Sequence, residues 1–233
     1  MTDPITPPVF ARARLRRDSP AAALAPILVP EEPGRRLGAA HSLVWALFAD
    51  GPERRRDFLW REVRPGEFLI LAARMPADPH NLFDLECKPF APVLRSGQHL
   101  RFDLRGNPVI AVPQGPGRRG KRSDVVMHAI HNIAKAERAE AREAAVRDAG
   151  ASWLARKGEA AGFAIDSDRL YIDRYERVRI PRDGACAIVF STLTFQGVLT
   201  VLEPARFLVN VLRGFGAAKA FGCGLMLIRR APP

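Results

Sequence analysis

The order of strand-like and helix-like patterns, which occurs twice along this chain, constrains its fold more than any other feature. In the first half, alternating and helical apolar spacings predict a strand, a helix, two strands, a short helix and a strand. These elements are expected at residues 9–15, 37–50, 57–63, 67–75, 79–85 and 87–93. This β-α-β-β-α-β order is typical of the ferredoxin-like (RRM-like) fold.

The second half repeats this order with longer parts. We expect a strand pair, two helices, two strand regions, a short helix and a closing strand, with a mobile basic loop after the strand pair. They are placed at residues 99–112, 125–148, 152–161, 163–180, 185–202, 204–212 and 223–230, with the loop at 115–124. The sequence therefore predicts an α+β protein of two tandem ferredoxin-like domains, residues 1–92 and 93–233.

The chain carries a net charge of +11, from 36 Lys and Arg against 25 Asp and Glu. Only 5 of the basic residues are Lys, so a genome rich in G and C explains part of the Arg excess, but not the sign of the net charge. A polyanionic partner does explain the sign, because each neutralised phosphate releases counterions and adds affinity. We therefore favour a nucleic-acid partner over a merely basic surface.

The three cysteines are widely spaced and form neither a Cys-x-x-Cys pair nor a cluster with histidines, which favours reduced thiols. The N-terminus lacks a basic-then-apolar signal pattern, and no apolar run approaches the roughly 20 residues that span a bilayer. We expect a cytoplasmic protein without a membrane partner.

Four glycines lie between the last predicted helix and the last strand, at positions 214, 216, 222 and 224. A dinucleotide-binding fingerprint has the opposite order, with its glycines after a strand and before a helix. Here Gly214, Gly216, Gly222 and Gly224 would let backbone amides approach another chain closely, and Lys219 would contact phosphate. A turn that serves only packing is an equally good interpretation.

This stretch has the form G-x-G-x-A-K-x-x-G-C-G, which resembles the glycine-rich loop of the CasE family of type I-E CRISPR systems. The segments FQGVLTVLEPARF, HSLVWALFADGPERRRDFLWREV and ASWLARKGEAAGFAI are also similar to that family. The resemblance implies tandem ferredoxin-like domains and cleavage of precursor CRISPR RNA at the 3′ base of its repeat hairpin. It also implies that the mature guide RNA is kept for other Cascade subunits.

His41, in the first predicted helix, lies where the family has its catalytic histidine. Imidazole, with a pKa near 6.5, accepts or donates a proton at neutral pH, as attack by a ribose 2′-hydroxyl on the adjacent phosphorus requires. The resemblance thus implies a metal-independent endoribonuclease without a cofactor that leaves a 2′,3′-cyclic phosphate. From spacing alone, a surface or helix-cap histidine is the commoner interpretation.

Family members often carry a tyrosine three residues before this histidine, and this chain has Gly38 there. The second catalytic role therefore stays open among Ser42, Arg36 and a Lys or Arg from elsewhere, each of which would orient the 2′-hydroxyl or stabilise the phosphorane. Lys219 is the better candidate for phosphate contact. No catalytic role is assigned to Tyr171 or Tyr175.

Further basic residues are candidates for RNA contact, because recognition of an A-form stem depends on shape and phosphate. The main set is the GRRGKR run, and secondary sets lie in WLARK and before the second strand. These residues are Arg118, Arg119, Lys121 and Arg122, then Arg156 and Lys157, and then Arg54–Arg56. A solvated loop is the alternative for each run.

Two further interpretations remain. His128 and His131 have the spacing of a metal pair, but no third ligand follows a recognisable pattern, which favours a polar helix face and no metal. A tandem RRM-like subunit that binds RNA without cutting it is the main functional alternative, although no K/R-G-F/Y-G/A-F-V-x-F/Y strand is present. An assembly subunit with a decayed site is the third, because of Gly38.

Overall fold

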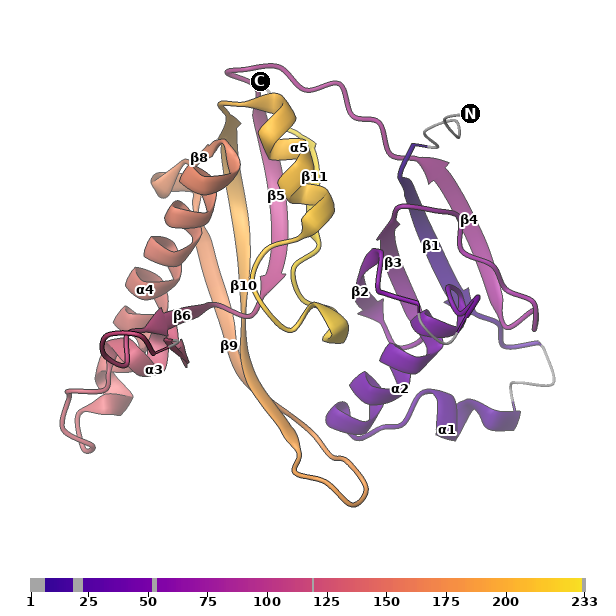
Figure 1. Ribbon diagram of the computed structural model, residues 1–233, viewed down its shortest axis with the longest axis horizontal. Coiled ribbons are helices and arrows are strands. Elements are labelled where there is room, and N and C mark those ends of the chain that lie inside the picture. The colour runs from indigo at the N-terminus through magenta and orange to yellow at the C-terminus, as the bar shows by residue number, and fades with distance from the viewer. Residues whose placement is uncertain (1–6, 19–22, 52–53, 119, 232–233) are drawn as a thin grey trace. The chain divides into compact units, whose positions relative to one another are not determined.

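A computed structural model describes residues 7–18, 23–51, 54–118 and 120–231 (Figure 1). The contacts divide the chain into two compact units. The first unit comprises the chain up to Val93 together with two segments from the C-terminal half, Arg179–Ile188 and Lys219–Leu225. The second comprises Leu94–Val178, Val189–Ala218 and the chain from Met226 onward.

The first unit is an antiparallel sheet covered by one long helix. Its elements are β1 (Val9–Leu15), α1 (Ala25–Leu28), α2 (Pro33–Ala46), β2 (Phe58–Arg64), β3 (Glu67–Ala72) and β4 (Phe83–Pro89). The strand order is β2-β3-β1-β4, so the first and last strands are neighbours. The core lies between α2 and the sheet, where Leu43 and Val44 of the helix and Trp60 and Phe68 of the strands are buried.

Helix α2 begins where the sequence supplies both a cap and a fixed backbone angle. The Glu32 carboxylate accepts hydrogen bonds from the backbone N–H groups of Gly34 (2.8 Å) and Arg35 (2.6 Å), and Pro33 takes the first helical position. These bonds hold the pKa of Glu32 below its usual value. Gly34 is needed there, because a Cβ would overlap the carbonyl oxygen of Arg179.

The helix expected at 79–85 is wrong. The described residues 73–82 form a loop, and β4 starts at Phe83, whose N–H is bound by the Asp78 carboxylate at 2.7 Å. The cause is strand pairing: β4 matches β1 along its whole length, from Val9 opposite Pro89 to Leu15 opposite Phe83. The same pairing places the strand at 83–89 rather than 87–93.

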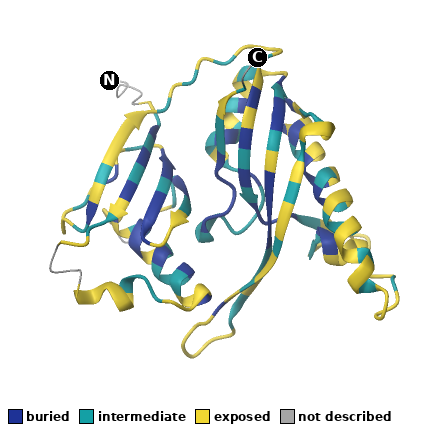
Figure 2. Ribbon diagram, turned by 180° about the vertical axis from the view of Figure 1, so that it is seen from behind, coloured by how far each residue is buried: buried dark blue, intermediate teal, exposed yellow. Residues whose placement is uncertain are grey.

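The second unit has a larger antiparallel sheet with helices on one face and a separate two-stranded hairpin. Its elements are β5 (His99–Gly106), β6 (Val109–Val112), β7 (Lys121–Asp124), α3 (Val125–Ala129), α4 (Arg138–Ala161), β8 (Phe163–Ile165), a 3-10 turn at Ser167–Arg169, β9 (Tyr171–Ile180), β10 (Ile188–Val201), α5 (Pro204–Arg213) and β11 (Met226–Arg230). The order is β11-β5-β10-β8, with β9 also paired to β10. Trp153 of α4 stacks on Phe195 at 5.5 Å between ring centroids, while the outer side of α4 is exposed (Figure 2).

Three expectations for this unit need correction. Residues 121–124 are not part of a loop but form β7, which pairs with β6. The first expected helix is interrupted after α3, where the Arg138 guanidinium binds the carbonyl oxygens of Ile133 and His131, each at 2.9 Å. Helix α4 then runs unbroken through Gly150, because that glycine packs closely on the side chain of Ile172.

The described helices include none that is long and apolar enough to cross a membrane. All three cysteines are free thiols, with Cys87 and Cys186 exposed and Cys223 buried.

Candidate active site and nucleic-acid interface

The His41 ring is tied to the glycine-rich loop. Its Nδ1 lies 2.8 Å from the carbonyl oxygen of Ala220, which also accepts a hydrogen bond from the Trp60 indole Nε1 at 3.2 Å. A carbonyl oxygen only accepts, so Nδ1 carries the proton of this bond. In the neutral ring, Nε2 is then left with a free lone pair and serves as the proton acceptor.

The surroundings of His41 favour its neutral form. Burial of the half-buried ring lowers its pKa, and the nearby Arg56 cation lowers it further, while the bond to Ala220 acts in the opposite direction. The net pKa lies below the ordinary value of about 6.5. His41 is therefore mostly unprotonated at neutral pH, as a general base must be.

Aromatic rings fix the orientation of the imidazole. Trp45 meets it edge-on at 6.3 Å between ring centroids, and Phe221 lies 5.3 Å away. Trp60 beneath the loop is fully buried, and a Cβ on Gly222 would lie 3.4 Å from its ring. Trp45 is itself only half-buried, beside His41.

Arg56 is a cation beside this histidine that has no carboxylate partner among the described residues. It is half-buried, its Nη1 has no hydrogen-bond partner in the described part of the chain, and burial lowers its pKa. Neighbouring Arg54 and Arg74 are instead paired with aspartates at 2.8–3.5 Å. Arg56 stands two residues before the buried Phe58. Residues two apart in a strand share a face, so extending the strand pattern back to Arg56 would have placed this residue on the side that faces α2.

The residues of α2 first considered for the second catalytic role each have contacts within the chain. Gly38 lies one helical turn before His41, and a Cβ there would contact only Ile180, at 3.6 Å. The position therefore has room for a side chain, but glycine supplies none. The Arg36 guanidinium lies 3.8 Å from the Glu62 carboxylate, and the Ser42 hydroxyl donates to the Gly38 carbonyl oxygen at 3.4 Å.

The glycine-rich loop has packing constraints of its own. Gly216 has a φ of +81°, and a Cβ there would lie 2.9 Å from the carbonyl oxygen of Asn107. Gly214 (φ +75°) ends α5, and Gly222 and Gly224 are buried with φ of +72° and +92°. These positions therefore need glycine whether or not RNA approaches. Lys219 begins the 3-10 turn that presents the Ala220 carbonyl to His41.

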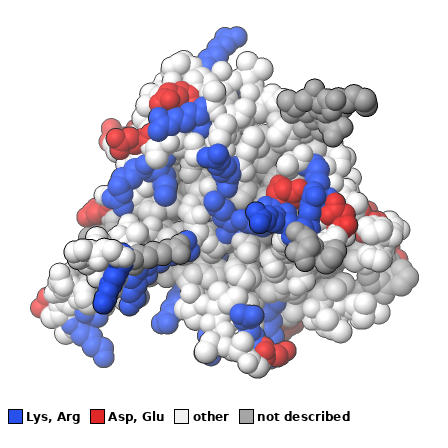
Figure 3. Space-filling view, in the orientation of Figure 1, with Lys and Arg blue, Asp and Glu red and all other residues white. Residues whose placement is uncertain are grey.

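The strongest basic segment of the second unit is the β6–β7 hairpin. Arg118 lies near its tip, and Lys121 and Arg122 lie on β7, opposite Val112 and Ala111; all three basic side chains are exposed. Arg119 falls outside the described residues. On the face of the molecule in Figure 3, Lys and Arg cover visibly more surface than Asp and Glu.

The two basic residues expected on α4 differ in exposure. Arg156 is exposed, whereas the Lys157 ammonium lies 5.8 Å from the centre of the Trp153 ring. His128 lies in the short helix α3 and His131 beyond its end, and the described residues contain no group of three His, Cys, Asp or Glu that could hold a metal ion.

Comparison with known proteins identifies the class. A family model described as CRISPR associated protein matches residues 10–230. Because the match covers nearly the whole chain, the protein belongs to this family.

Individual relatives narrow the assignment. The chain is 27% identical, over 87% of its length and 96% of the relative, to the CRISPR system Cascade subunit CasE of Escherichia coli. It is 31% identical, over 60% of each chain, to the CRISPR-associated endoribonuclease Cse3 of Thermus thermophilus. The structure of Thermus thermophilus Cse3 bound to an RNA representing a pre-cleavage complex has the same fold, with a TM-score of 0.66 at 24% identity over 97% of this chain and 100% of that one. These relatives place the chain in the CasE branch of the family.

Proposed function

We propose that this protein is a metal-independent endoribonuclease that binds the repeat hairpin of precursor CRISPR RNA and cleaves it at the 3′ base of the stem. The mature guide RNA stays bound, and the protein holds it for the other Cascade subunits in the cytoplasm. Two relatives are named a Cascade subunit and an endoribonuclease, which supports this proposal.

One observation carries the catalytic part of the proposal: the 2.8 Å bond between His41 Nδ1 and the Ala220 carbonyl oxygen. It joins the helix that carries the base to the loop that carries Lys219, and it leaves Nε2 as the proton acceptor. The bond thus brings an acid/base group and a phosphate-binding lysine within one unit of the fold.

The reaction follows from these groups. His41 Nε2 takes the proton of a ribose 2′-hydroxyl as that oxygen attacks the adjacent phosphorus. The bond from phosphorus to the 5′-oxygen breaks, and that oxygen takes up a proton from water. Arg56 stabilises the charge that grows on the phosphorane, in the second role that Gly38 cannot fill. The products are a 2′,3′-cyclic phosphate and a 5′-hydroxyl, and no step requires a metal ion.

Binding uses the remaining basic positions. Arg118, Lys121 and Arg122 of the β6–β7 hairpin contact the phosphates of the stem, with Arg156 and Lys157 as further contacts. The scaffold is a pair of tandem ferredoxin-like domains, residues 1–92 with the catalytic histidine and residues 93–233 with the basic hairpin. The orders β2-β3-β1-β4 and β11-β5-β10-β8 support this architecture. In the first sheet β1 lies between β3 and β4, and in the second sheet β5 lies in the same way between β10 and β11.

The test is cleavage of a repeat transcript in excess EDTA. His41→Ala should bind the hairpin normally and cut it about 10²–10⁴-fold more slowly, since the base acts in the transition state. A 2′-deoxy substitution at the cleaved nucleotide should stop the reaction while sparing binding. The exposed His80 supplies the matched control, and His80→Ala should cut at the normal rate.

Three results would reject the proposal. Cleavage of the deoxy substrate, or dependence on added Mg²⁺, would overturn the mechanism. Tight binding with no cleavage by the unaltered protein would establish the alternative, a subunit that only holds RNA.

A further inference from the structure

Two arginines face each other across neighbouring strands of the second unit. Arg229 of β11 is the direct partner of Arg101 of β5 in the antiparallel register, and both side chains are exposed. Like charges directly opposite one another destabilise a sheet. A group of opposite charge close by would remove this repulsion.

The described chain supplies no carboxylate to this pair. Arg101 and Arg229 take part in no ion pair among the described residues, and the nearby Asp103 accepts a hydrogen bond from Gln196 at 2.9 Å. A third guanidinium, that of Arg169, is 69% exposed and lies 3.6 Å from Asp166. The charge of Arg101 and Arg229 is therefore available to an anion from outside the chain, while that of Arg169 is partly neutralised by Asp166.

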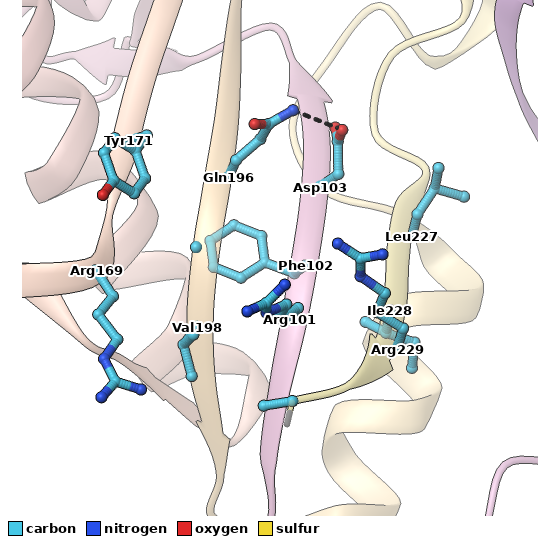
Figure 4. Close-up of a pocket in the computed structure, with 12 residues that line it drawn as sticks. Arg101, Phe102, Asp103, Arg169, Tyr171, Gln196, Val198, Leu227, Ile228 and Arg229 are labelled. Carbon is cyan, nitrogen blue, oxygen red and sulfur yellow. Dashed lines mark hydrogen bonds between the residues drawn. The ribbon is translucent and has the colours of Figure 1, made fainter. Parts of the chain in front are cut away.

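The three arginines line one hollow of about 780 Å³ over β5, β10 and β11. In Figure 4, Arg101 and Arg229 lie near the centre of the view, and Tyr171 and Arg169 lie toward its left edge. Tyr171 is 71% exposed, and its ring makes no aromatic contact with another described residue. Val198 and Leu227 give the hollow an apolar part.

We propose that this hollow binds a single-stranded stretch of RNA that adjoins the repeat hairpin. This proposal rests on the proposed function. The guanidinium groups of Arg101, Arg169 and Arg229 bind successive phosphates, and the Tyr171 ring stacks on an unpaired base. Stacking requires a base that is free of its partner, so the hollow takes a single strand rather than the stem. An acidic peptide would satisfy the arginines but would leave the tyrosine ring unused.

The experiment compares three non-cleavable RNAs, each with a 2′-deoxy nucleotide at the cleavage position: the hairpin alone, the hairpin with a 5′ extension and the hairpin with a 3′ extension. One extension should raise affinity for the unaltered protein. The double variant Arg101→Ala, Arg229→Ala should remove that gain, lower the salt slope for the extended RNA by about 1.4, and leave the bare hairpin unaffected. Tyr171→Ala should cost at least about fivefold in affinity, for the extended RNA alone.

Arg17→Ala combined with Arg95→Ala is the matched control, because it removes two exposed charges outside all the sites named here. If neither extension adds affinity, or if the control variant acts like the Arg101 and Arg229 variant, the inference is wrong. It is also wrong if a polyglutamate peptide binds with the same arginine dependence while the extensions add nothing. Failure to bind even the bare hairpin would instead reject the proposed function.

Discussion

The two sheets share one strand order but treat their arginines in opposite ways. On β1 of the first unit, Arg12 donates to the Glu67 carboxylate from its Nε at 2.6 Å, and Arg14 lies 3.2 Å from Glu86. On the second sheet, Arg101 lies opposite another arginine and has no carboxylate partner among the described residues. The arginines of β1 are neutralised by neighbouring carboxylates, whereas on the second sheet Arg105 is paired with Glu176 and Arg101 is not paired among the described residues.

The presence or absence of a carboxylate partner distinguishes arginines that stabilise the fold from arginines that are available to bind a ligand. Glu67 is only 8% exposed, and its bond from Arg12 holds its pKa below the usual value, so this pair stabilises the folded state above the carboxylate pKa and loses that effect as the pH falls. Arg56 and the basic side chains of the β6–β7 hairpin have no such partner among the described residues. We therefore expect the uncompensated arginines, in either unit, to be those that contact RNA.

The largest effect is expected at Arg56, the uncompensated arginine of the first unit. Arg56→Gln should lower the rate of cleavage about 10²–10³-fold, because it removes the charge that stabilises the phosphorane. It should also shift the acidic limb of the pH–rate profile to higher pH, since the Arg56 cation is one cause of the lowered His41 pKa. Single-turnover rates between about pH 5 and 8 measure both changes.

Arg55→Gln is the control, because Arg55 is exposed and adjacent in the chain. A lower rate for Arg56→Gln with an unmoved pH profile would show that the guanidinium acts on the phosphorane without lowering the pKa of His41. Equal effects of the two substitutions would remove Arg56 from the site.

The next effect concerns the β6–β7 hairpin. Replacing Arg118, Lys121 and Arg122 with Ala should weaken hairpin binding at least about tenfold and reduce the salt slope by about 2 to 3, at about 0.7–0.9 per lost phosphate contact. Titrations of the RNA at several salt concentrations measure both.

An equal loss of charge from compensated positions provides the contrast. Replacing Arg12, Arg14 and Arg16 with Ala should lower stability and leave the salt slope unchanged, because these arginines are bound by carboxylates. If both triple variants change the slope equally, affinity depends on net charge alone, and the distinction between the two kinds of arginine fails.

Local patterns predicted much of the fold. The strand at 9–15 is confirmed residue for residue, and the first helix and the β2–β3 hairpin lie within a few residues of their expected positions, because their apolar spacing is a property of the segment itself. The loop at 73–82 and β7 were missed because both depend on pairing with a distant strand, β1 in one case and β6 in the other.

The site likewise combines features that the sequence predicts with features that depend on contacts between distant segments. His41 was selected through resemblance to a family and Lys219 through its place in the glycine-rich loop. The structure adds the contact between His41 and Ala220, which the spacing of residues along the sequence cannot show. Arg56 was only one of a run of three arginines until burial distinguished it from Arg54. The opposition of Arg101 and Arg229 depends on the register of two strands far apart in the sequence, and register is set by packing rather than by either segment alone.

The smallest effect tests the contrast between the sheets most directly, because it predicts opposite signs for the same substitution. Arg101→Glu creates an opposite-charge pair with Arg229 and should raise the free energy of unfolding by about 0.2–1 kcal/mol. Arg12→Glu removes the hydrogen bond to the buried Glu67 carboxylate and adds a like charge, so it should lower the same quantity by at least about 1.5 kcal/mol. Urea unfolding at neutral pH measures both, and Arg101→Gln separates relief of repulsion from the new attraction. If Arg101→Glu destabilises the protein as Arg12→Glu does, Arg101 contributes packing or charge that the fold requires. Arg101 is then not an uncompensated charge available to bind an anion.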